Sequence, residues 1–286
     1  MTGRLELTLD AHCQLAESPV WSEQSQRLLF VDITGRRLFK FDPESRTLET
    51  CAIEEDIGCV APEINGGFVA GLRSGLWMLD EQGRKQRLLA ANPEDSKVSR
   101  FNDGRVDPSG RFLAGTVDEA KAGRAGLYRY DKFGLSKLAG GLLTSNGLAF
   151  SPDGRTLYHS DTPRFVVNRY DYDPASGAAT NRRVFVQLEP TAADRGRPDG
   201  AAVDVEGCYW TALYEGSRVQ RYDPQGKLMA DFAVPAQCPT MPAFGGAELK
   251  TLFVTTARDA GGTGGGVYSM RVDVAGLPAT LFDSTL

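Results

Sequence analysis

The stretch SNGLAFSPDGRTLYHSD, residues 145–161, carries the pattern that decides the fold. Two short segments rich in apolar and β-forming residues, 148–150 and 156–158, flank the sequence Pro152-Asp153-Gly154. Proline fixes one backbone dihedral of a turn and glycine accepts a positive φ, so the chain can reverse its direction there. The stretch therefore predicts an antiparallel hairpin.

The same unit recurs along the chain. A polar or small residue opens each copy, an apolar or small residue follows about four positions later, and a turn and a second strand come next. The opening residues of the six copies are Glu17, Gly58, Asn102, Asn146, Asp199 and Thr240. Their spacing of about 40 to 53 residues is the period of a four-stranded propeller blade.

These repeats predict an all-β protein, a six-bladed β-propeller that forms a single domain over residues 1–286. A β-sandwich is the rival all-β fold, but its turn signals would not carry six copies of one unit. No segment shows a sustained helical period of apolar residues. We expect the strand near residues 5–9 to pair with the last blade and so to join the N- and C-terminal strands.

A second repeated segment follows each hairpin. Its copies, such as residues 37–42 and 126–131, alternate apolar with polar side chains and end at aspartate or a turn. This alternation predicts half-exposed outer strands. The longest irregular stretches, 119–125, 192–198 and 257–265, are expected to form loops over one face of the ring.

Composition excludes several classes of partner. The chain has 286 residues and a net charge of −5, so it has no basic surface for nucleic acid or for an anionic membrane. It has neither a signal peptide pattern nor an apolar run of the roughly 18 residues that a membrane helix needs. Its five cysteines lack any CxxC spacing, which is typical of thiols in a reducing compartment. We expect a cytoplasmic protein, either a monomer or a weak homodimer.

The opening residues of the six units meet around one mouth of the central channel if the propeller is correct. They supply two carboxylates, two carboxamides, one hydroxyl and one glycine. Carboxylates that face each other in a confined channel repel one another and lose hydration, and a hard cation relieves both costs. Oxygen ligands favour Ca²⁺, Mg²⁺ or Mn²⁺, and Zn²⁺ with oxygen ligands stays open. The alternative is that these polar residues cap turns or hold water, as Asn-Gly and Asp-Gly pairs often do.

Nucleophilic catalysis has little support. Only His12 and His159 are available, and no GxSxG motif accompanies them. We interpret both as packed or surface histidines. The glycine-rich stretch 261–266 is followed by no helix and carries no lysine, so we interpret it as a flexible loop.

Four motifs, in this order, resemble the regucalcin/gluconolactonase (senescence marker protein) family. They are AESPVW at residues 16–21, RFNDG at 100–104, SNGLAF at 145–150 and PDG at 198–200. The resemblance covers essentially the whole chain. It implies a six-bladed propeller that binds one divalent metal ion and hydrolyses sugar lactones to aldonic acids. By position, it implies Glu17, Asn146 and Asp199 as metal ligands, Arg100 and Asn102 as substrate-binding residues, and either Asp118 or Glu119 as a further substrate contact.

The expected chemistry is hydrolysis of a sugar lactone with the cation as Lewis acid. Asp199 is the obvious candidate for the general base, although a carboxylate bound tightly to a metal is a weak base and metal hydroxide is the alternative. Arg100 would bind substrate oxygens or an anionic substituent. A sulfonated or otherwise anionic lactone is an alternative substrate, given Arg100 and the further loop arginines Arg164 and Arg197.

Two other functions are alternatives to the enzyme. A calcium-binding regulatory protein without significant turnover needs Glu17, Asn146 and Asp199 but has no need of Arg100 or Asn102. A scaffold propeller should show aromatic or apolar residues on its loop face instead of a ring of polar groups. The presence of Arg100 and Asn102 favours the enzyme.

Overall fold

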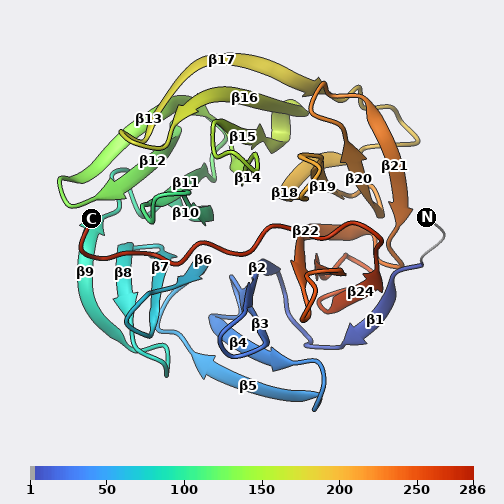
Figure 1. Ribbon diagram of the computed structural model, residues 1–286, viewed down its shortest axis with the longest axis horizontal. Coiled ribbons are helices and arrows are strands. Elements are labelled where there is room, and N and C mark those ends of the chain that lie inside the picture. Colours follow the sequence, from blue (N-terminus) through green and yellow to red (C-terminus); the bar gives the residue numbers. More distant parts are fainter. Residues whose placement is uncertain (1–3) are drawn as a thin grey trace.

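Six antiparallel sheets of four strands each surround a central axis in the computed structural model, which describes residues 4–286 (Figure 1). The predicted six-bladed all-β propeller is confirmed. The helical content of the described chain is one 3-10 turn, η1 (Thr162–Arg164). Among residues 4–286, no helix is long and apolar enough to cross a membrane.

The blades follow one another along the chain. Blade one contains β2 (Ala16–Ser22), β3 (Arg27–Asp32), β4 (Arg37–Asp42) and β5 (Thr47–Ala52). Blade two contains β6 (Ile57–Pro62), β7 (Phe68–Leu72), β8 (Gly75–Leu79) and β9 (Lys85–Ala91). Blade three contains β10 (Ser99–Val106), β11 (Phe112–Asp118), β12 (Ala125–Asp131) and β13 (Gly134–Leu142). Blade four contains β14 (Ser145–Phe150), β15 (Thr156–Asp161), β16 (Val166–Asp173) and β17 (Ala178–Gln187). Blade five contains β18 (Arg197–Val203), β19 (Tyr209–Tyr214), β20 (Arg218–Tyr222) and β21 (Leu228–Ala233).

Blade six is built from both ends of the chain. Its inner three strands are β22 (Cys238–Gly245), β23 (Thr251–Ala257) and β24 (Val267–Arg271), and its outer strand is the N-terminal β1 (Glu6–Leu9). Strand β1 pairs antiparallel with β24, with Glu6 opposite Ser269 and Leu7 opposite Tyr268. The first and last strands of the chain therefore share one sheet, which fixes the last blade to the first.

The expectation of half-exposed outer strands was wrong for the second repeated segment. Those segments are the third strands, β4, β8, β12, β16, β20 and β24, and most of their residues are buried or partly buried. A fourth, more polar strand covers each of them; β5, for example, has no fully buried residue. The polar residues of the third strands, such as Lys40 and Arg129, are partly buried and not fully exposed.

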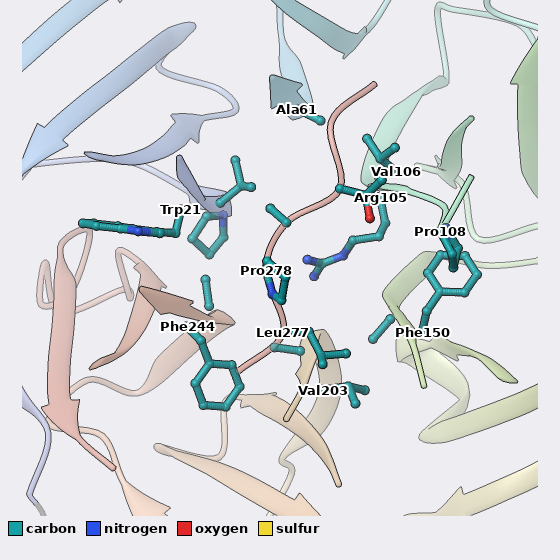
Figure 2. Close-up of a pocket in the computed structure, with 18 of the residues that line it drawn as sticks. Trp21, Ala61, Arg105, Val106, Pro108, Phe150, Val203, Phe244, Leu277 and Pro278 are labelled. Atoms are coloured by element: carbon teal, nitrogen blue, oxygen red, sulfur yellow. The ribbon is translucent and has the colours of Figure 1, made fainter. Parts of the chain in front are cut away.

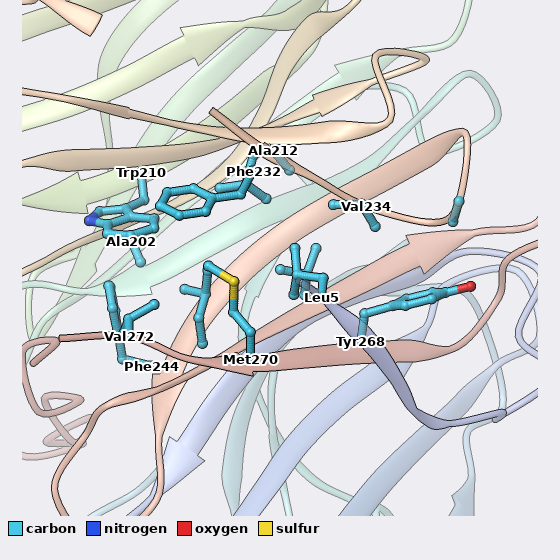
Figure 3. Close-up of a cluster of buried hydrophobic side chains, with 14 residues drawn as sticks. Leu5, Ala202, Trp210, Ala212, Phe232, Val234, Phe244, Tyr268, Met270 and Val272 are labelled. Carbon is cyan, nitrogen blue, oxygen red and sulfur yellow. The ribbon is translucent and has the colours of Figure 1, made fainter. Parts of the chain in front are cut away.

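The hydrophobic core lies between neighbouring blades. In one cluster Trp210 and Phe232 of blade five stack with their ring centroids 5.1 Å apart, and Met270 of blade six packs in the same cluster (Figure 3). Leu5, which precedes β1, is 1% exposed and belongs to this cluster. Burial of such side chains contributes about 1.5–3 kcal/mol each, so the core holds each blade against the next.

All six inner strands, β2, β6, β10, β14, β18 and β22, run from one face of the ring to the other. We call the face where they begin the mouth face. Because neighbouring strands alternate in direction, the connections β11–β12, β17–β18 and β23–β24 also lie on the mouth face. These connections contain the three irregular stretches that the sequence predicted as loops over one face.

The opposite end of the channel is a chamber of about 330 Å³. All six inner strands line it, with side chains such as Trp21, Phe150 and Phe244 (Figure 2). The C-terminal segment 276–283, which we call the strap, runs across it. At the far end of the strap, Phe282 is 1% exposed and exchanges backbone hydrogen bonds with Pro62 and Ile64.

Candidate functional site

Each inner strand bears a β-bulge at its opening residue. The strand register shifts between Glu17 and Val20 in β2 and between Asn146 and Ala149 in β14, and equivalent shifts occur in the other four blades. A bulge adds a residue to one strand and redirects the side chains beside it. Ser18 and Gly147, which follow two of the opening residues, have φ values of 51° and 63°. The bulges therefore set the direction of side chains at the mouth of the channel.

Three of the predicted site residues form one hydrogen-bonded chain. Asn102 Nδ2 donates to Asn146 Oδ1 at 2.9 Å, and Asn146 Nδ2 donates to Asp199 Oδ1 at 2.5 Å. Asn146 Nδ2 also donates to Thr162 Oγ1, which in turn donates to the carbonyl of Pro198. These bonds connect blades three, four and five at the axis.

Glu17 enters this group from blade one. Its Oε2 accepts from the backbone amide of Ser18 at 3.0 Å, and the carboxylate is 8% exposed. Its charge is the strongest electrostatic influence on Asp199. The structure thus brings Glu17, Asn102, Asn146 and Asp199 together at the mouth of the channel.

Asp103 is a further acidic residue at this site that the sequence reasoning did not single out. It follows Asn102 in the RFNDG motif and is 5% exposed. Its Oδ2 accepts from the backbone amide of Leu148 at 2.8 Å, whereas its buried Oδ1 has no hydrogen-bond partner among the described residues. Alternation along a strand would aim Asp103 away from the axis, and the bulge between Phe101 and Gly104 removes that alternation.

Burial dominates the electrostatics of the three carboxylates. It raises the pKa of Glu17 to about 8, with the charge of Asp103 as the second cause. It raises the pKa of Asp103 to about 6 and that of Asp199 well above its usual range, with Glu17 as the second cause for Asp199. No ion pair within residues 4–286 involves any of the three. The site therefore gathers three buried carboxylates that form no ion pair, and the charge of Arg105 offsets part of the effect of burial on the pKa of Asp103.

This donor set fits a hard divalent cation. Buried carboxylates and carboxamides are the oxygen ligands that Ca²⁺, Mg²⁺ and Mn²⁺ prefer, and a cation would satisfy the unpartnered Asp103 Oδ1 or its neighbours. The second oxygens of Glu17 and Asp199 accept no hydrogen bond in the described chain. Asn146 Oδ1 accepts one hydrogen bond, from Asn102, and an amide oxygen has a second lone pair that can face a cation.

The two remaining members of the ring contribute no ligand side chain. Thr240 Oγ1 bonds to the carbonyl of Ala16 and to Thr255 Oγ1, at 2.6 and 2.7 Å. At Gly58, a Cβ atom would lie 2.2 Å from the backbone oxygen of Phe101, so blade three approaches too closely for a side chain. The glycine therefore allows close packing of blades two and three.

Arg100 lies beside the hydrogen-bonded chain. Its Nη1 donates to Asn102 Oδ1 at 2.7 Å and to the carbonyl of Phe101 at 3.0 Å. Its Nε and Nη2 have no partner in the part of the chain that the structure describes. Arg100 can therefore donate to a molecule bound at the mouth.

Asp118 and Glu119 have different surroundings. The Asp118 carboxylate accepts from the backbone amides of Ala120, Ala122 and Arg124 and from the Arg124 side chain, so it holds the β11–β12 loop in shape. The Arg124 side chain is the main cause that lowers the pKa of Asp118. Glu119 is exposed and pairs with Arg73 at 2.6 Å.

Two other groupings of reactive residues lie outside this arrangement. Ser145 Oγ and His159 Nε2 are 2.7 Å apart, but both residues are fully buried and burial lowers the pKa of His159 to about 3. This agrees with the interpretation of His159 as a packed residue; His12 is exposed and lies 3.1 Å from Asp10. Asp204, Glu206 and Cys208 cluster at the β18–β19 turn, where Arg221 pairs with both carboxylates.

Comparison with known proteins gives one consistent result. The family described as "SMP-30/Gluconolactonase/LRE-like region" matches residues 15–258. The chain is 41% identical over 278 residues to a 6-deoxy-6-sulfogluconolactonase of Pseudomonas putida, covering 94% of each chain. It is 36% identical over 264 residues to regucalcin of Xenopus laevis, covering 90% of this chain and 87% of that protein. A solved structure of a calcium-binding protein, regucalcin, from Agrobacterium tumefaciens superposes with a TM-score of 0.90 at 27% identity, covering 98% of each chain.

Proposed function

Since the chain belongs to the SMP-30/gluconolactonase/LRE-like family, we propose that it is a lactonase that opens a sugar lactone to the aldonic acid with one divalent cation bound at the mouth of its channel. The observation that carries the proposal is the group of three buried carboxylates, Glu17, Asp103 and Asp199, none of which forms an ion pair in the described chain. Metal binding relieves the cost of such a group, and lactone opening uses the charge that a metal brings.

Glu17, Asn146 and Asp199 would hold the ion. The chemistry that a divalent ion supplies in such a site is polarisation of a carbonyl and stabilisation of the negative charge that develops on its oxygen. Ca²⁺, Mg²⁺, Mn²⁺ and Zn²⁺ all accept oxygen ligands, so the proposal covers each of them.

Asp199 is the proposed general base. Asn146 holds its Oδ1 at 2.5 Å, which leaves Oδ2 to accept a proton from the water that attacks the lactone carbonyl carbon. In the absence of a cation, burial and the neighbouring Glu17 charge raise the pKa of Asp199 above its usual range.

Arg100 and Asn102 are the proposed substrate-binding pair. The bond between Arg100 Nη1 and Asn102 Oδ1 fixes the guanidinium, and its Nε and Nη2 can donate to substrate oxygens. Of the two acidic candidates in the β11–β12 loop, Glu119 is the one we propose as a substrate contact, because Asp118 is committed to the loop backbone.

The decisive experiment is a panel of aldonolactones assayed for acid release after chelation and after re-addition of Ca²⁺, Mg²⁺, Mn²⁺ or Zn²⁺. We expect activity to disappear on chelation and to return with at least one ion. Glu17→Gln should lower metal affinity and activity together. Full activity of the chelated protein, or unchanged metal content in Glu17→Gln, would contradict the proposed cation site.

A calcium-binding protein without significant turnover is the second candidate, because the superposed Agrobacterium structure is described as a calcium-binding protein. The same panel separates the two functions. Tight Ca²⁺ binding together with no acid release from any lactone would favour the second candidate.

A further inference from the structure

Lys121 is an exposed lysine on the mouth face that no carboxylate neutralises. It lies in the β11–β12 loop, and its Nζ donates to Thr144 Oγ1 at 2.6 Å. Thr144 stands two positions before Asn146, and its carbonyl accepts from the amide of Thr162, whose hydroxyl bonds Asn146. The Lys121 ammonium is therefore held on the mouth face at the start of β14, the strand that bears Asn146.

The charged groups around Lys121 have partners of their own. Asp118 is bound by Arg124, and Asp161 is bound by Arg164 at 2.6 Å. Among the positively charged neighbours, Arg197 pairs with Glu215 at 3.0 Å and lies over the Tyr214 ring. Arg164 and Arg197, the loop arginines that the sequence suggested for an anionic substrate, are thus already paired.

Arg100 is a second cation near Lys121 that forms no ion pair in the described part of the chain. Neither Lys121 nor Arg100 takes part in an ion pair within residues 4–286, and the Arg100 charge acts on Lys121 more strongly than any other charged group does. The partial burial of the ammonium group beside Thr144 and the Arg100 charge both lower the pKa of Lys121. Two unpaired cations that repel each other form a site that an anion would stabilise.

The carboxylate of Asp118 sets the shape of the loop that carries Lys121. It accepts hydrogen bonds from the backbone amides of Ala120, Ala122 and Arg124, on both sides of the lysine. The backbone at Lys121 is therefore fixed at both ends.

We propose that Lys121, together with Arg100, binds an anionic group on the lactone substrate, a sulfonate or a phosphate at the end away from the reacting carbonyl. This inference rests on the proposed lactonase function and assigns its substrate class to anionic aldonolactones. Arg100 serves any sugar lactone through its donors, whereas Lys121 is the residue that selects the charged ones.

The test compares the specificity constant kcat/KM for 6-deoxy-6-sulfogluconolactone, 6-phosphogluconolactone and gluconolactone. The Lys121→Met variant removes the charge, Lys121→Arg restores it, and Lys132→Met is the control at an exposed lysine on the β12–β13 turn. We expect Lys121→Met to lose about tenfold or more in kcat/KM for the anionic lactones and less than about twofold for gluconolactone, because a charge-assisted hydrogen bond is lost. Lys121→Arg should recover most of the loss. The anionic lactone with the higher kcat/KM in the wild-type protein identifies the bound group as a sulfonate or a phosphate.

Salt supplies an independent readout. Raising ionic strength should lower kcat/KM of the wild-type protein for the anionic lactone more than that of Lys121→Met, because salt screens exposed charges. Equal losses for charged and neutral lactones in Lys121→Met would overturn the assignment while leaving the lactonase function intact.

Binding without turnover separates the two proposals. Calorimetry with 6-deoxy-6-sulfogluconate should show weaker binding by Lys121→Met than by wild type and Lys132→Met. This result supports the anion site even if no lactone is opened, in which case the proposed function alone fails. Equal affinity in all three proteins would overturn the anion site.

Discussion

At the scale of a single residue, Asp199 is proposed to act both as a metal ligand and as a general base, and these two roles oppose each other. A metal ligand shares its electrons with the ion, whereas a base needs them for a proton. The hydrogen bond from Asn146 occupies one oxygen of Asp199 and leaves the other without a protein partner. The two oxygens can therefore serve different purposes.

Asp199→Asn keeps the shape of the side chain and removes its basicity. We expect kcat to fall by about 10²–10⁴-fold, the contribution of a positioned base, while the melting temperature of the metal-loaded protein changes little. Asp194→Asn is the control, since Asp194 is exposed and pairs with Arg218 on the same face. Near-normal turnover of Asp199→Asn would remove Asp199 from the role of base.

His159 gives the stability of the protein a pH dependence. Its pKa is lowered by burial to about 3, against about 6.5 in an unfolded chain. Between these values the unfolded state binds a proton that the folded state does not. The contribution of His159 is therefore complete above about pH 6.5 and is lost as pH falls, with a slope of about 1.4 kcal/mol per pH unit.

Urea unfolding at several values between pH 4 and pH 7 tests this expectation. His159→Gln should flatten the dependence of the unfolding free energy on pH, and His12→Gln, at an exposed histidine, should not. An unchanged slope in His159→Gln would contradict the lowered pKa, because it would mean that His159 binds its proton equally well in the folded and unfolded states.

At the scale of the element, the β-bulge in each inner strand sets the direction of the side chains at the mouth of the channel. Gly147 in β14 has a φ of 63°, and a Cβ atom there would lie 2.3 Å from Ser160 Oγ and 2.9 Å from the backbone oxygen of Asp199. The bulge thus brings the backbones of blades four and five close together beside the site.

Gly147→Ala should lower the unfolding free energy by about 1–3 kcal/mol and weaken metal binding, because both the backbone angle and the contact with Asp199 resist a methyl group. Gly134→Ala is a matched control, with a φ of 97° and no atom within 4 Å of the added carbon. Gly134→Ala should lower the unfolding free energy only through the strained backbone angle. Its metal affinity, measured by calorimetry, should stay unchanged. Equal metal affinities of the two variants would contradict the close approach at Gly147.

The sequence predicted the blades well because every inner hairpin repeats the same apolar segments and turn chemistry. It did not reveal the fourth strands, such as β5, since their exposed edges carry few apolar residues. Bulges add one residue without changing the hydrophobic pattern, so the direction of Asp103 could not be predicted. Lys121 was missed for a related reason: its neighbours Thr144 and Arg100 come from other strands and meet it only in the folded ring.

At the scale of the whole molecule, two sets of contacts hold the ring of blades closed. Strand β1 pairs with β24 at the edge of blade six. The strap crosses the chamber to blades two and three, where the backbone amide of Asp283 donates to the carbonyl of Gly110 (Figure 1). Phe282 inserts into the core there, with its ring centroid 6.2 Å from that of Phe112. The strap therefore connects blades that are distant along the chain.

Phe282→Ala should lower the unfolding free energy by about 3–5 kcal/mol, the usual cost of removing a buried aromatic ring. Leu281→Ala is the control, because Leu281 is 39% exposed and should cost less than about 1 kcal/mol. Urea titration measures both variants. A small effect of Phe282→Ala would mean that the strap does not contribute to the stability of the ring.

Arg105 lies inside the channel between the cation site and the chamber. Its Nε donates to the carbonyl of Leu148 at 3.0 Å and its Nη2 to that of Ala201 at 2.6 Å, so the side chain bridges three blades (Figure 2). Arg105 and the strap both lie across the path from the mouth to the back of the channel, so we expect substrate and product to pass through the mouth. Newly formed acid must depart by the route that fresh lactone takes to arrive, so the two compete for one entrance, and the acid should act as a competitive inhibitor.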